Sequence, residues 1–132
     1  MTLLQKLQGL FSNKTETSDR HLVPELKSRY YKVTDKKAFE AVEALFSSND
    51  QYTVTSVSAE RGEMSAMVQK PKKAFAVATV ISIRPFETAV DFNVTTETAL
   101  PTDFGYSKKV VLSFYDELDK QLPRIQTGKD RS

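Results

Sequence analysis

The acidic residues nearest the end of the predicted sheet are Asp91, Glu97 and Asp103. Two carboxyl groups held close together, with pKa values pushed apart, could perform general acid–base chemistry. Asp91 and Glu97 fall on the same face of one predicted strand, but they are six positions apart, which corresponds to about 20 Å. They therefore cannot form such a pair with each other. Asp103 is better interpreted as a turn or helix-start residue beside Thr102.

Other side chains with reactive chemistry are scarce. The chain has no cysteine and one histidine, His21, so thiolate chemistry is excluded and a zinc site with two or three histidine ligands is not expected. No serine lies in a G-x-S-x-G nucleophile elbow, and the four glycines are too scattered to form a phosphate-binding loop. We therefore expect no catalytic residue, no metal and no cofactor, and we predict that the protein is not an enzyme.

The charges of the side chains are balanced along the whole chain. The 19 Lys and Arg residues against 17 Asp and Glu residues give a net charge of +2. No segment carries the basic excess that neutralising phosphates requires, so nucleic acid is not an expected partner. The hydrophobic runs fall short of the roughly 20 residues of a membrane span. Residues 1–11 also lack the features of a secretory signal, so we expect a cytoplasmic protein.

The hydrophobic spacing predicts one α+β domain over residues 22–123 of the 132-residue chain. The predicted elements are a strand at 26–33, a helix after Thr34 or Asp35, strands at 52–59, 63–70, 74–84 and 88–97, and a helix at 106–122. Short connections favour antiparallel hairpins between neighbouring strands. The expected fold is an antiparallel sheet of about five strands with two helices packed on one face, in the order β-α-β-β-β-β-α. Residues 124–132 are expected to be a disordered tail.

Side chains alternate between the two faces of a strand, so each predicted strand divides into two sets. We expect the bulkier apolar set to face the core: Tyr52, Val54, Met64, Ala66, Val68, Phe75, Val77, Thr79, Ile81, Ile83, Val90, Phe92 and Val94. The opposite set is mostly small and uncharged, and we interpret it as a face for self-association or ligand binding. Its candidate interface residues are Thr55, Ser65, Met67, Ala76, Ala78, Val80 and Asn93. A solvated face of good strand-forming residues is the alternative.

Residues 1–11 have the spacing of an amphipathic helix. The apolar positions of this segment are Leu3, Leu4, Leu7, Leu10 and Phe11. Residues 12–20 contain no apolar side chain, and we expect residues 12–21 to form a flexible tether. A helix of about eleven residues is marginal alone in water, so its apolar side needs a partner. We favour a protein partner or a second copy of the chain over the chain's own domain, with weak contact to a membrane surface third.

The order of the predicted elements resembles the TATA-binding-protein-like superfold, which small uncharacterised bacterial domains also use. Residues 96–112 are similar to the closing segment of one such family of unknown function, through Thr102, Asp103, Gly105 and Lys109. The family's arginine–serine pattern before this turn is missing, as is its acidic pair in the preceding strand. The resemblance covers residues 26–122 and implies the fold but no functional residue. DNA binding cannot be inherited from a fold.

These patterns together favour a small non-catalytic interaction module. It would self-associate or dock a protein partner through the N-terminal helix, the low-charge sheet face or both. A small-ligand-binding domain, which would use that face or the space between the helices and the sheet, is the alternative. An enzyme of unknown reaction is third, because no acid, base and nucleophile can be assembled from these residues.

Overall fold

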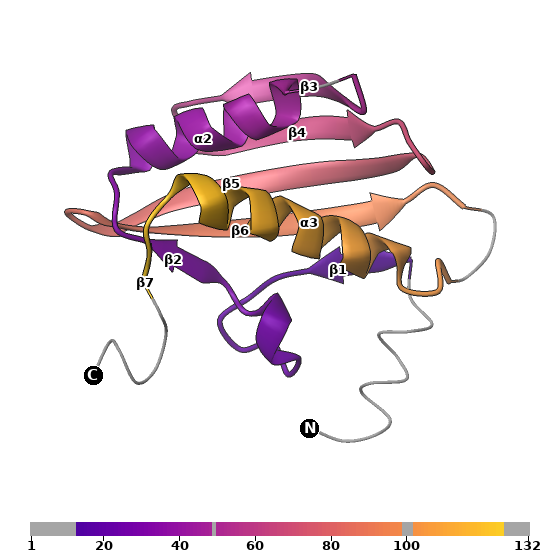
Figure 1. Ribbon diagram of the computed structural model, residues 1–132, viewed down its shortest axis with the longest axis horizontal. Coiled ribbons are helices and arrows are strands. Elements are labelled where there is room, and N and C mark those ends of the chain that lie inside the picture. The colour runs from indigo at the N-terminus through magenta and orange to yellow at the C-terminus, as the bar shows by residue number, and fades with distance from the viewer. Residues whose placement is uncertain (1–12, 49, 99–101, 126–132) are drawn as a thin grey trace.

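The computed structural model describes residues 13–48, 50–98 and 102–125. Over these residues the chain forms an antiparallel sheet, and two α-helices lie on one of its faces (Figure 1). The predicted α+β class, with two helices on one face of an antiparallel sheet, is therefore confirmed. The sheet has seven strands rather than about five, because short strands near both ends of the described chain add to one edge.

The four long strands are neighbours in chain order, and each pairs antiparallel with the next: β3 (Tyr52–Ser58), β4 (Glu63–Val68), β5 (Ala74–Arg84) and β6 (Glu87–Thr96). Their short connections allow only hairpins, as predicted. The far edge of β6 pairs with two short strands placed end to end, β1 (Lys14–Glu16) and β2 (Arg29–Tyr31). β7 (Arg124–Ile125) then pairs with β2.

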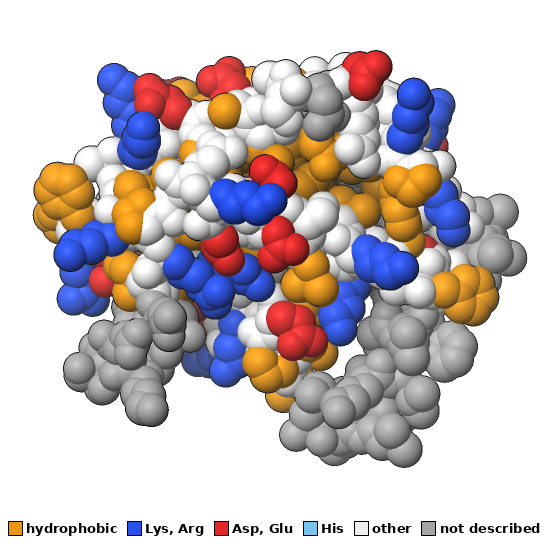
Figure 2. All heavy atoms as spheres, in the orientation of Figure 1, with side chains coloured by type: hydrophobic (Ala, Val, Ile, Leu, Met, Phe, Trp, Pro, Cys, Tyr) orange, Lys and Arg blue, Asp and Glu red, His pale blue; other side chains and the backbone are white. Residues whose placement is uncertain are grey.

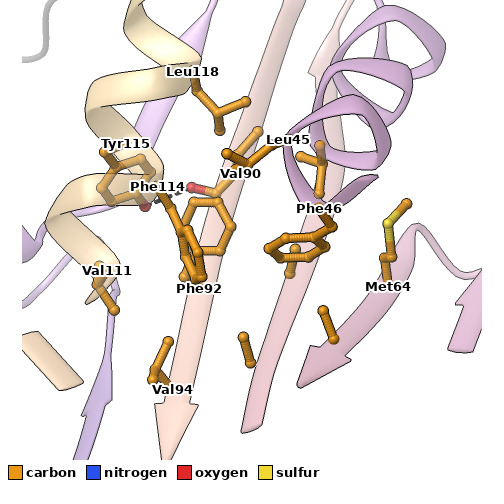
Figure 3. Close-up of a cluster of buried hydrophobic side chains, with 14 of the residues drawn as sticks. Leu45, Phe46, Met64, Val90, Phe92, Val94, Val111, Phe114, Tyr115 and Leu118 are labelled. Atoms are coloured by element: carbon orange, nitrogen blue, oxygen red, sulfur yellow. Dashed lines mark hydrogen bonds between the residues drawn. The ribbon is translucent and has the colours of Figure 1, made fainter. Parts of the chain in front are cut away.

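The two α-helices meet the sheet through a cluster of aromatic side chains (Figure 3). α2 (Asp35–Ser47) contributes Phe46, α3 (Tyr106–Gln121) contributes Phe114 and Tyr115, and β6 contributes Phe92. The ring centroid of Phe92 lies 5.0 Å from that of Phe114 and 5.1 Å from that of Tyr115. All four rings are buried, so they fill the layer between the helices and the sheet.

β5 turns the opposite set of side chains towards the core from the set that we predicted. The small side chains that we assigned to the outside are the buried ones: Ala74, Ala76, Ala78 and Val80. Phe75 and Ile81, which we assigned to the core, are 41% and 47% exposed, and Val77, Thr79 and Ile83 accompany them outside the core. Both sets of β5 are apolar, so alternation alone could not say which set points inward. Small residues on this central strand leave room for the rings of Phe46 and Phe92.

On β4 and β6 the predicted inward set is confirmed. Its buried members are Met64, Ala66, Val68, Val90, Phe92 and Val94. On β3, Tyr52 and Val54 are partly buried and pack against the core. These strands alternate apolar with polar residues, and that contrast indicates the buried face correctly.

Local hydrogen bonds set the start of each α-helix. The Thr34 hydroxyl accepts from the Lys37 amide at 3.2 Å and caps α2, as predicted. Before α3, the Asp103 carboxylate accepts from the Gly105 amide at 2.9 Å and the Ser107 amide at 3.1 Å. Asp103 therefore acts as the helix-start residue expected from its position.

The predicted first strand, residues 26–33, is shorter in the structure. A 3₁₀ turn, η1 (Pro24–Leu26), precedes it, and strand pairing is confined to β2. All three residues of β2 are buried, so this strand does not alternate between a buried and an exposed face. This agrees with the imperfect alternation of apolar and polar side chains in the sequence of the segment.

The structure contradicts the flexible tether over residues 14–17. β1 pairs with β6, and the Thr17 amide donates to the Phe92 carbonyl oxygen at 2.9 Å. Strand pairing uses backbone groups, so it does not require the apolar side chains whose absence suggested a tether. In the same way, β7 replaces the start of the predicted disordered tail. The predicted N-terminal helix (residues 1–11) and the rest of the tail (residues 126–132) lie outside the described residues.

Candidate functional site

A hollow of about 230 Å³ opens beside the first half of α3, and we call it the α3 pocket. Its walls come from α3, from the start of β3, from the end of β4 and from the turn that follows β4. The lining residues are Gln51, Tyr52, Val68, Pro71, Tyr106, Lys109, Val110 and Ser113. Apolar side chains come to the surface between the two helices and towards this turn (Figure 2). The pocket is therefore built from segments that are far apart in the sequence.

One wall of the α3 pocket is a single face of α3. Tyr106, Lys109, Val110 and Ser113 follow the spacing of neighbours along one side of a helix. Val110 is buried and forms part of the floor, whereas Lys109 and Ser113 are exposed at the rim. The pocket thus combines an apolar floor with a cation and a hydroxyl at its mouth.

The opposite wall is formed by Tyr52, whose ring packs edge-on against Phe46 and Phe114. Burial raises the pKa of the Tyr52 hydroxyl; a hydrogen bond with Ser113 opposes this effect, and the Glu117 carboxylate adds to it. The phenol is therefore protonated at neutral pH and can donate a hydrogen bond. Val68 lies opposite Tyr52 on the neighbouring strand and continues the apolar surface.

Hydrogen bonds between α3 and the β4–β5 turn hold the mouth of the pocket. The Tyr106 hydroxyl donates to the Lys72 carbonyl oxygen at 2.8 Å, and the Lys72 amide lies 3.2 Å from the same hydroxyl oxygen. The Lys72 ammonium nitrogen lies 5.6 Å from the centroid of the Tyr106 ring. The turn and the helix are thereby tied together at the mouth of the pocket.

Charge at this end of α3 favours an anion. Lys108 and Lys109 both lie in the first turns of the helix, where the backbone dipole is also positive. Lys108 is paired with Glu25 at 3.3 Å, but none of the ion pairs formed by the described residues includes Lys109. The ammonium group of Lys109 therefore lies at the rim of the α3 pocket, outside these ion pairs.

A second cluster of polar side chains lies where α3 crosses β2. The Arg29 guanidinium meets the Asp119 carboxylate at 2.7 Å, and the Tyr31 hydroxyl donates to the same carboxylate at 2.7 Å. Arg29 also lies 4.4 Å from the centroid of the Tyr115 ring. Burial, followed by the hydrogen bond to Asp119, raises the pKa of the Tyr31 hydroxyl.

This second cluster extends to Asp91 on β6 through Thr17, whose hydroxyl oxygen lies 3.2 Å from the Tyr115 hydroxyl oxygen. The Asp91 carboxylate accepts from the Thr17 hydroxyl at 2.6 Å and from the Ser28 hydroxyl at 2.5 Å. Every buried polar side-chain atom among the described residues has a hydrogen-bond partner. The cluster therefore fastens α3 to β6, to β2 and to the segment that follows β1.

The residues that we predicted as an interface are divided by the structure. Thr55, Ser65, Met67 and Asn93 lie on the face of the sheet away from the helices, as expected. The other three, Ala76, Ala78 and Val80, are buried under the helices because β5 is turned over. The predicted N-terminal contact residues Leu3, Leu4, Leu7, Leu10 and Phe11 lie outside the described residues.

Sequence reasoning did not identify the α3 pocket. Tyr52 was assigned to the core, and Lys109 was given no functional role although it lies near the start of the predicted last helix. One signal was available, because a lysine in the first turns of a helix opposes the helix dipole and needs another explanation. His21, in contrast, is a local loop residue whose Nδ1 accepts from the Val23 amide at 3.0 Å.

Comparison with known proteins gives one structural likeness. No family model and no curated protein sequence matches the chain. A solved structure of a START superfamily protein from Mycobacterium smegmatis is 14% identical and superposes with a TM-score of 0.49. The superposition covers 71% of this chain and 90% of that one. The α+β class assigned above rests on the strand pairing of this chain and does not depend on that likeness.

Neither α-helix in the described part of the chain combines the length and the apolar character needed to cross a bilayer.

Proposed function

We propose that the protein binds a small organic anion in the α3 pocket. The observation that carries this proposal is the juxtaposition of the Lys109 ammonium, outside the ion pairs of the described residues, with the apolar floor made by Val68 and Val110. Small-molecule sites in proteins typically pair an apolar lining with a few placed polar groups. The small-ligand-binding domain, the alternative expected from the sequence, is thus the function that this geometry supports best.

The size of the pocket limits the class of ligand. A cavity of about 150 Å³ can hold one benzene molecule. A pocket of about 230 Å³ suits a single ring or a short branched chain that carries one acidic group. The ring would lie against Tyr52 and Val110, with its carboxylate towards the Lys109 ammonium.

The proposal can be tested by titrating isotope-labelled protein with benzoate and following the backbone amide signals. We expect the signals of residues around Val68 and Val110 to shift, and benzyl alcohol, which has the same ring but no charge, to bind several-fold more weakly. Lys109→Gln should weaken benzoate about fivefold, in line with roughly 1 kcal/mol for a rim ion pair. Lys108→Gln is the matched control, because it removes the same charge at a residue outside the pocket.

A variant that fills the pocket gives an independent check. Ser113→Phe places a ring over the mouth at an exposed position and keeps the charge of the chain unchanged. We expect it to abolish the benzoate-induced shifts while the protein stays folded. Shifts that survive in Ser113→Phe, or that respond equally to Lys109→Gln and Lys108→Gln, would overturn the proposal.

A further inference from the structure

The face of the sheet away from the helices carries an apolar stripe, which we call the outer stripe. It runs along β5 through Phe75, Val77 and Ile81. Met67 on β4 adjoins it, because Met67 is paired with Phe75 on β5. Phe75 and Ile81 expose more than two-fifths of their surface. None of the described helices covers this side of the sheet (Figure 1).

The outer stripe has the dimensions of one short helix. Phe75 and Ile81 are six residues apart on one strand, which corresponds to about 20 Å. Residues 1–11, if helical, would be about 16 Å long and about 10 Å wide. Two copies of the chain pressed together through a stripe of this size would bury far less than the roughly 1,200 Å² of a stable interface. The stripe therefore fits a single amphipathic segment better than a second copy.

The chain reaches the sheet at the end where the stripe begins. The Thr96 amide donates to the Asn13 carbonyl oxygen at 2.8 Å, and Lys14 pairs with Thr95. Thr95 pairs in turn with Phe75, so Lys14 and Phe75 lie in one row, two strands or about 10 Å apart. Residues immediately before Asn13 are therefore within reach of Phe75.

The composition of the N-terminal segment matches the outer stripe in both apolar character and charge. Residues 1–11 carry their apolar side chains on one side of the expected helix and contain Lys6 but no acidic residue. The sheet face that flanks the stripe carries the acidic residues Glu16, Glu63 and Asp91 together with the basic residue Lys14, so acidic side chains predominate among these four. An occupant with a basic polar side is favoured there.

We propose that residues 1–11 dock along the outer stripe of their own sheet, with Leu7 at the centre of the contact. This docking would satisfy both partners at once, since an isolated amphipathic segment and a bare apolar face each need burial. The sequence alone led us to favour a protein partner for residues 1–11, whereas this proposal favours the chain's own domain. The proposal does not depend on ligand binding in the α3 pocket, which lies on the other side of the sheet.

The absence of cysteine allows a direct test in the chain of 132 residues. A single cysteine from Thr79→Cys would report on the middle of the outer stripe, and one from Thr53→Cys would report on the same face at β3. We expect the Thr79→Cys thiol to react with a water-soluble maleimide at least tenfold faster when Leu7→Glu is added. The Thr53→Cys thiol should react at the same rate in both backgrounds.

Two controls decide between the possible occupants. Gln5→Glu adds the same charge to the polar side of the expected helix, so it should leave Thr79→Cys protected. Light scattering over a range of concentrations should show a monomer. Equal labelling rates with and without Leu7→Glu would overturn the proposal. Protection that is lost on dilution, together with a dimer mass, would also overturn it by assigning the stripe to a second copy.

Discussion

Replacing Ala78 by leucine tests the orientation of β5, on which both the core and the outer stripe depend. Ala78 is fully buried and lies between Met64 and Phe92, its partners on the two neighbouring strands. Leucine adds three carbon atoms under aromatic rings whose centroids are 5.0 to 6.5 Å apart. Overpacking of this kind costs about 1 to 3 kcal/mol. Ala78→Leu should therefore lower the free energy of unfolding by about that amount.

The neighbouring residue supplies a matched control. Thr79 points to the other face, between Glu63 and Asp91, where it is partly exposed. Thr79→Leu introduces the same side chain one residue further along, and we expect its effect on stability to stay within about 0.5 kcal/mol. The two variants place the same leucine side chain on opposite faces of β5.

Urea unfolding followed by far-ultraviolet circular dichroism measures both variants. Ala78→Leu should shift the midpoint to lower urea with an unchanged slope, and Thr79→Leu should leave the midpoint near that of the parent. The sequence-based assignment, with Thr79 inside and Ala78 outside, predicts the opposite order. A neutral Ala78→Leu together with a destabilised Thr79→Leu would refute the arrangement described here, and the outer stripe with it.

Three further substitutions probe the polar groups that hold the fold. Asp119→Ala leaves the buried Arg29 guanidinium without its carboxylate and should lower the free energy of unfolding by about 2 to 4 kcal/mol. Urea unfolding measures this loss, which should be similar at low and at high salt concentration. For Asp103, burial raises the pKa, but hydrogen bonds from Thr96, Ser107 and the Gly105 amide outweigh it and hold the pKa below its usual value. Its contribution to stability is therefore complete above about pH 4 and is lost as the pH falls through the folded-state pKa, so Asp103→Ala should flatten the acid limb of a stability–pH curve. Tyr115→Phe removes the 2.7 Å hydrogen bond from the Tyr115 hydroxyl to the Val90 carbonyl oxygen. The free energy of unfolding in the same urea assay should fall by about 1 kcal/mol. An unchanged free energy of unfolding would mean that this hydrogen bond does not contribute to stability.

Local sequence patterns were sufficient to predict the main elements. The change from helical to alternating spacing located α2, the four long strands and α3 to within a few residues. The Thr34 cap and the role of Asp103 could also be predicted, because a helix start depends on groups that are adjacent in the chain. The α+β class then follows from the order of elements and the shortness of their connections.

The remaining features depend on groups that only the folded chain brings together. β1 exists because β6 offers a free edge to its backbone, a requirement that side-chain composition does not encode. The orientation of β5 depends on the space left by Phe46 and Phe92, which come from other elements. The α3 pocket joins Tyr52 to Lys109 across more than fifty residues of sequence. Alternation along a strand thus determined which side chains share a face, whereas three-dimensional packing decided which face is buried, because only packing compares the volumes of residues from distant segments.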